Sequence, residues 1–152
     1  MKIKSLIVLV LVFFLASCDK TRVYEKNIDL DRYQWKYDDK VSFDFVLDDV
    51  NSKKVFLNFR HAELFAYRNV IIKLEIINPK GEKENLDLNI ALSEPNGMWF
   101  GDCSGDICDL KYPINYTFKD TGKYVFSFEQ NMRENPLKHV MSIGLRVENT
   151  EK

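Results

Sequence analysis

Large apolar residues alternate with polar ones in short segments along most of this chain, and this period of two constrains its fold more than any other feature. In the segment 41–47, every second residue is a large apolar one. Successive side chains of an extended strand point to opposite faces, so such a segment buries one face and exposes the other. Similar apolar patterns occupy 55–59, 70–77, 86–92, 112–118, 124–128 and 140–147.

Turn sequences separate these segments at short intervals. They are Asn-Pro-Lys-Gly at 78–81, Pro-Asn-Gly at 95–97 and Asp-Thr-Gly-Lys at 120–123. Proline fixes φ and glycine permits a positive φ, so each sequence favours a reversal of the chain. Residues 60–68 have some helical character but lack capping residues and length. The pattern predicts an all-β fold, an antiparallel, jelly-roll-like β-sandwich of about eight or nine strands.

The N-terminal segment has the features of a secretory signal. Two lysines precede an apolar run over 6–15, and Leu-Ala-Ser leads into Cys18. The run is shorter than the roughly 20 residues that span a bilayer. The cysteine after Leu-Ala-Ser resembles the bacterial lipobox, whose cysteine is acylated and becomes the first residue of the mature protein. We therefore predict a lipoprotein signal peptide at 1–17 and lipidation at Cys18; the alternative is a plain secretory signal.

Removal of residues 1–17 defines the predicted mature chain. It has 135 residues, a size that suits one domain with a real core. The removed segment holds two lysines and no acid, so the formal charge changes from −1 to −3. So small a net charge argues against nucleic acid as a partner. We expect a lipid-anchored tether at 18–32 and a β-sandwich domain at 33–152.

Three aromatic residues at alternate positions open the predicted domain. Tyr33, Trp35 and Tyr37 would share one face of an extended segment. Alternation by itself favours burial of these rings in the first strand. The alternative is an aromatic platform that binds a sugar or a protein partner.

The remaining two cysteines, Cys103 and Cys108, form an even pair. In an exported protein such a close pair favours a disulfide that fixes the shape of one loop. Free thiols and a dithiol redox site remain open, although catalytic dithiols usually lie two residues apart.

Catalytic motifs are missing from the sequence. His61 and His139 have no metal-ligand partner at the spacing of known sites. The sequence has no nucleophile elbow, phosphate loop, dinucleotide fingerprint or HExxH helix. Acidic residues between 102 and 109 suggest a calcium loop, but Ile107 stands where that loop needs glycine. We predict no catalytic residue, metal or cofactor, and hence no enzyme.

Several short motifs in a fixed order give the chain a family resemblance. They are Arg-Val-Tyr-Glu at 22–25, Trp35 before 41–45, the turn at 78–81, Pro-Asn-Gly at 95–97, Trp-Phe-Gly at 99–101, Gly-Asp-Ile at 105–107, and the segments 122–126, 130–133 and 143–147. With these motifs the chain resembles the gliding-motility lipoproteins of the GldH family, found in bacteria of the Bacteroidetes group. The paired cysteines depart from that pattern, which makes a disulfide a local variation.

The resemblance implies a cell-envelope lipoprotein, most simply at the outer membrane, in a gliding machinery linked to type IX secretion. It implies envelope proteins as partners and supplies no catalytic residues. We therefore predict a non-catalytic interaction component whose binding face includes Trp99 and Phe100 in the loop at 95–109. The alternative is a carbohydrate-binding lipoprotein that uses Trp35, Trp99 and tyrosines. Exposed coplanar aromatics in a polar groove would favour the sugar; an apolar or mixed patch would favour a protein.

Overall fold

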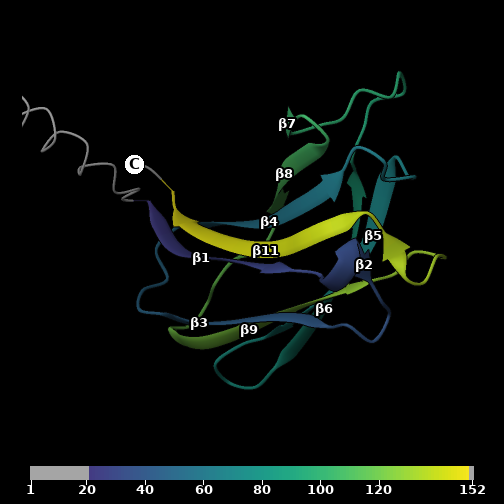
Figure 1. Ribbon diagram of the computed structural model, residues 1–152. Coiled ribbons are helices and arrows are strands. Elements are labelled where there is room, and N and C mark those ends of the chain that lie inside the picture. Colours follow the sequence, from purple (N-terminus) through teal and green to yellow (C-terminus); the bar gives the residue numbers. More distant parts are fainter. Residues whose placement is uncertain (1–20, 151–152) are drawn as a thin grey trace, which may run out of the picture.

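The predicted sandwich of antiparallel strands is confirmed by a computed structural model, which describes residues 21–150 (Figure 1). Two antiparallel sheets face each other, and their inner side chains form one core. The described residues contain eleven strands, more than the eight or nine expected. The predicted signal peptide at 1–17 and Cys18 lie outside the described residues.

The larger sheet has five strands in the spatial order β1-β11-β4-β8-β7. Their bounds are β1 (Arg22–Asp29), β11 (Val140–Asn149), β4 (Lys53–Ala62), β8 (Ile107–Ile114) and β7 (Asp102–Ser104). The first and last strands of the chain therefore pair, and β4 lies at the centre of the sheet. Figure 1 shows β1, β11 and β4 side by side in the upper layer.

The second sheet has four strands in the order β3-β9-β5-β6. Their bounds are β3 (Val41–Leu47), β9 (Gly122–Gln130), β5 (Asn69–Ile77) and β6 (Lys83–Ala91). A separate pair, β2 (Gln34–Trp35) with β10 (Leu137–Lys138), lies at the end of the sandwich opposite the start of β1 (Figure 1). A single 3-10 turn, η1 (Asp31–Tyr33), leads from β1 into β2.

Alternation dictates which side chains enter the core. In β3 the four apolar residues at odd positions are buried and the three between them are exposed, as predicted. Phe45 packs against the rings of Phe118, Tyr124 and Phe126, with centroids 5.6 to 6.1 Å apart. Aromatic pairs at such separations add to the stability that burial supplies. Phe45 also stacks on Tyr24 of β1, with centroids 5.0 Å apart, so the core is continuous across the two sheets.

The prediction of a tether at 18–32 is wrong for most of its described residues. Residues 22–29 form β1, which pairs with β11 from Arg22 opposite Glu148 to Asp29 opposite Ser142. β1 is an edge strand with no fully buried residue, so its sequence lacks the strong apolar alternation of an inner strand. The folded domain thus begins at the start of β1, ahead of the predicted boundary at residue 33.

Two further segments differ from expectation. The strand predicted at 112–118 is β8, which ends at Ile114, and buried Phe118 reaches the core from a loop. Residues 60–68 form no helix; they complete β4 and a loop before β5. Across residues 21–150, no helix is long and apolar enough to span a bilayer.

Candidate functional site

The loop at 92–101 is a compact reversal beside the end of β4. The Phe100 amide donates to the Leu92 carbonyl and the Glu94 amide donates to the Met98 carbonyl, both at 2.8 Å. Gly97 has φ of +89°, the left-handed conformation that glycine adopts without strain. The predicted turn at 95–97 is therefore present, and exposed Met98 directly follows it.

A disulfide braces the neighbouring hairpin of β7 and β8. Cys103 and Cys108 face each other across the hairpin and are joined at 2.03 Å. Of the three states that the sequence left open, the structure contains the disulfide. Asp109, one acid of the candidate calcium loop, instead pairs with Arg60 through two hydrogen bonds of 2.6 and 3.0 Å. Within residues 21–150, no three His, Cys, Asp or Glu side chains gather as a metal site.

A buried imidazole supports Trp99 beneath this loop. The rings of His61 and Trp99 meet edge-on with centroids 4.6 Å apart, and Phe65 packs on the same imidazole. His61 Nδ1 lies 2.9 Å from the Ala62 carbonyl oxygen. Because that oxygen only accepts, Nδ1 carries the proton, and Nε2 has no hydrogen-bond partner among the described residues. Burial lowers the pKa of His61, so the ring is held neutral.

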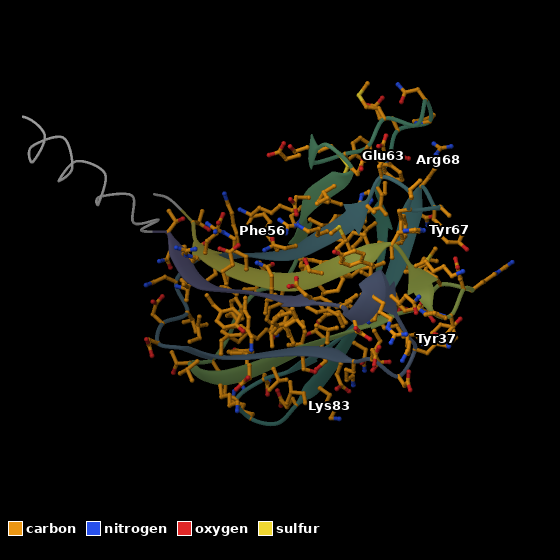
Figure 2. All side chains as sticks on the ribbon, in the orientation of Figure 1. Tyr37, Phe56, Glu63, Tyr67, Arg68 and Lys83 are labelled. Atoms are coloured by element: carbon orange, nitrogen blue, oxygen red, sulfur yellow. A yellow bond between two sulfur atoms is a disulfide. The ribbon has the colours of Figure 1, made fainter. Side chains whose placement is uncertain are left out.

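Four exposed apolar side chains lie at this end of the sandwich. Leu64 is 75% exposed and Met98 64%, and Phe100 and Ile107 are also exposed. The segments of Leu64 and Ile107 adjoin, because the Glu63 amide donates to the Asp106 carbonyl and Ala62 pairs with Ile107. The Trp99–His61 contact brings the loop with Met98 and Phe100 to the same end of β4. Figure 2 labels Glu63 at this end, far from the start of β1. We call Leu64, Met98, Phe100 and Ile107 the apolar end patch.

The structure separates the three aromatics predicted to bind. Phe100 belongs to the apolar end patch, and half-buried Trp99 lies beneath it. Trp35 is completely buried, and its Nε1 donates to the Asp39 carbonyl at 2.8 Å. The binding role predicted for Trp35 is therefore wrong. The burial that alternation favoured for the three rings holds for Trp35 alone, since Tyr33 and Tyr37 are 53% and 46% exposed. Sequence reasoning missed Leu64, which lies outside the predicted loop at 95–109 and comes beside it only through the fold, and it did not single out Met98 within that loop.

A polar groove crosses the outer face of the five-stranded sheet. Its volume is about 370 Å³, and Asn58, Arg60 and Asp109 are among the residues that line it. Asn58 donates to both Glu25 and Asn27 at 3.1 Å. No aromatic ring is among the lining residues, so the groove lacks the stacking platform expected of a sugar site.

Ion pairs stiffen one wall of the polar groove. Arg146 donates to Glu25 at 2.8 Å and to Glu148 at 2.7 Å, and Lys111 donates to Glu148 at 3.1 Å. Burial raises the pKa of both glutamates, but hydrogen bonds outweigh it and leave each pKa below its usual range. Glu25 accepts from Arg22 as well as Arg146, and Glu148 accepts from Arg146 and Lys111. These ion pairs thus form a charged network that fixes the side chains along one wall of the groove.

Fold and site together define a class: an antiparallel β-sandwich whose loops form an apolar patch at one end. The particular family follows from sequence comparison, since the model for the GldH lipoprotein family matches residues 22–147. The chain belongs to this family. The match starts at the first residue of β1, which agrees with a folded domain that begins there.

Two relatives show how far the similarity extends. A gliding motility lipoprotein GldH homolog of Christiangramia forsetii is 32% identical and aligns with 92% of this chain and 91% of its own length. The gliding motility lipoprotein GldH of Flavobacterium johnsoniae is 29% identical, over 97% of this chain and 98% of its own. Membership of a lipoprotein family implies a lipid-anchored chain at the cell envelope.

Among solved structures, a family GH115 4-O-methyl-alpha-glucuronidase matches 89% of this chain with a TM-score of 0.46 and 10% identity. This chain covers 18% of that enzyme's chain. Similarity at this level carries no argument about function.

Proposed function

We propose that this chain is a non-catalytic interaction component of a gliding-motility machinery linked to type IX secretion. Lipid on Cys18 would hold it at the outer membrane, and the apolar end patch would bind an envelope protein. The names of its relatives support the gliding role. The observation that carries the binding role is the exposure of the patch.

The patch has the properties of a protein-binding surface. Exposed apolar residues that gather on a soluble domain commonly mark such surfaces, whereas scattered ones do not. Aromatic residues and methionine are enriched where proteins meet, and Phe100 and Met98 supply both here. The disulfide and the Trp99–His61 contact hold the loops in one conformation, which lowers the entropy lost on binding.

Photo-crosslinking in the source bacterium tests this proposal. A photoreactive residue at position 98 should give a specific protein adduct, which mass spectrometry identifies. Position 46 is a matched control, because Val46 is 63% exposed on β3 and lies outside the patch. Met98→Asp should abolish an adduct formed from position 100, and Val46→Asp should leave it unchanged. A patch that gives no adduct, or the same adducts as position 46, would contradict the proposal.

Carbohydrate binding is the second candidate function; the polar groove would serve it through hydrogen bonds alone, since no aromatic ring lines it. Paired amide, carboxylate and guanidinium groups there offer both donors and acceptors to sugar hydroxyls. A glycan array compares the wild-type chain with Asn58→Ala, which removes the amide shared by Glu25 and Asn27. Binding by the wild-type chain that the variant loses would favour this alternative, and no binding by either chain would remove it.

A further inference from the structure

The folded domain begins very close to the predicted lipid. The proposed function places the lipid on Cys18, and this inference rests on that placement. Asp19 and Lys20 alone separate Cys18 from Thr21. Three residue steps span at most about 11 Å in any conformation. Thr21 is itself part of the fold, because its carbonyl accepts a hydrogen bond of 2.7 Å from the Asn149 amide.

Three segments surround Thr21 at this end of the sandwich. The Thr150 amide donates to the Ser52 carbonyl at 3.0 Å, and the Ser52 hydroxyl donates to the Thr150 hydroxyl at 3.2 Å. The loop between β3 and β4 is thereby joined to the chain beyond β11. We call residues 21–23, 48–54 and 149–150 the anchor face. In Figure 1 it lies at the left, where β1 starts.

We propose that the anchor face rests directly on the lipid headgroups of the membrane that holds the chain. The headgroup layer on each side of a bilayer is roughly 5 to 7 Å thick. A reach of about 11 Å from an acylated cysteine therefore keeps the face in or beside that layer. The short link between Cys18 and Thr21 is therefore our reason to propose the lipid surface as the partner of this face.

The composition of the anchor face suits that contact. Val23 and Val50 are two exposed apolar side chains on this face, at 38% and 45%. The Lys53 side chain is buried and pairs with Asp49. The remaining charges of the face are the exposed cations Arg22 and Lys54 against the exposed acid Asp48. This balance does not repel anionic headgroups, and it adds a weak attraction to the covalent anchor.

Contact at the anchor face also sets the distance between the membrane and the apolar end patch. β4 begins at Lys53 on the anchor face and ends at Ala62, beside the patch. Ten residues at about 3.3 Å each make this strand roughly 30 Å long. The patch therefore projects some 30 Å from the membrane, so that a partner reaches it without displacing lipid.

Nitroxide quenching in vesicles tests the inference. The full lipidated chain is purified with a fluorophore on either Val50→Cys or Met98→Cys and reconstituted into phosphatidylethanolamine–phosphatidylglycerol vesicles with nitroxide-labelled headgroups. The fluorophore at position 50 should lose most of its emission, and the one at position 98 should lose none. A flexible twenty-residue Gly/Ser insertion after Lys20 should abolish most of the loss at position 50, since it frees the face from the membrane.

The outcomes separate this inference from the proposed function. A purified chain that does not float with vesicles lacks the lipid, which overturns the anchor at Cys18 and the inference with it. A chain that floats but is quenched equally at positions 50 and 98 keeps its anchor and overturns the inference alone. The same result follows if the Gly/Ser insertion leaves the quenching at position 50 unchanged.

Discussion

The edge of the Trp99 ring lies against the buried imidazole of His61, with 4.6 Å between the ring centroids. The contact joins a loop to the inner face of β4, across 38 positions of the chain. It holds the loop that presents the apolar end patch. The protonation state of His61 is therefore coupled to the packing of that loop.

His61 should make the stability of the domain depend on pH. Burial lowers the pKa of His61 below its ordinary value of 6.5, so the unfolded chain binds this proton more readily than the folded one. The stability that His61 contributes by staying neutral is fully present above pH 6.5. It is lost as the pH falls from there through the lowered pKa, by at most about 1.4 kcal/mol per pH unit. Chemical denaturation between pH 7.5 and 5.5 measures the slope, which His61→Leu should flatten.

A substitution at a neighbour that does not titrate separates the effect of packing from that of protonation. Phe65→Leu thins the same cluster, since Phe65 packs against His61, and should lower the stability by a similar amount at every pH. A slope that persists in His61→Leu would show that another group controls it.

Gly101 should be far less tolerant of a side chain than Gly81. Both have a positive φ, of +91° and +81°, so alanine is strained at either position. A Cβ on Gly101 would also lie 2.2 Å from the Asp109 carbonyl oxygen, whereas one on Gly81 meets nothing within 4 Å. We expect Gly101→Ala to destabilise by about 3 kcal/mol and Gly81→Ala by about 1 kcal/mol, as measured by denaturant unfolding. Equal losses would contradict the close approach of Gly101 to β8.

The inner strands were predictable because their pattern is local. In β3 each alternate residue enters the core, so the sequence carries both its bounds and its face. The apolar alternation past β8 was misleading, because Phe118 is buried by packing on Tyr124, 4.9 Å away, and not by strand pairing. β1 was missed because its pairing partner lies more than 110 residues away and its own residues are mostly exposed.

The candidate site was predictable only in part for a similar reason. Trp99 and Phe100 stand in one loop with turn residues, which marked that loop as a binding surface. The support from His61 and the neighbouring position of Leu64 depend on tertiary contacts that no spacing in the sequence records. Alternation favoured burial of Tyr33, Trp35 and Tyr37 alike, but only Trp35 enters the core, because β2 is two residues long and the two tyrosines lie outside it.

Trp35 should behave as a core residue and not as a ligand-binding one. Its side chain is completely buried, so Trp35→Ala removes a large apolar surface and the hydrogen bond from Nε1 to the Asp39 carbonyl. We expect a loss of about 3 to 5 kcal/mol in the free energy of unfolding, measured by denaturant titration. Tyr33→Asn is the matched control, since Tyr33 is 53% exposed and asparagine tolerates its φ of 56°. A loss below 1 kcal/mol in Trp35→Ala would contradict the burial.

The disulfide should stabilise the hairpin locally more than it stabilises the domain. Because it closes a loop of only six residues, its removal in the Cys103→Ala, Cys108→Ala double variant should cost about 2 kcal/mol. Amide exchange should accelerate in β7, an edge strand that pairs with β8 alone, and change little in β5. Crosslinking from position 98 should weaken as well, because the hairpin supports the loop beneath the apolar end patch. Alkylation of the native chain tests the premise: two reactive thiols before reduction would contradict it.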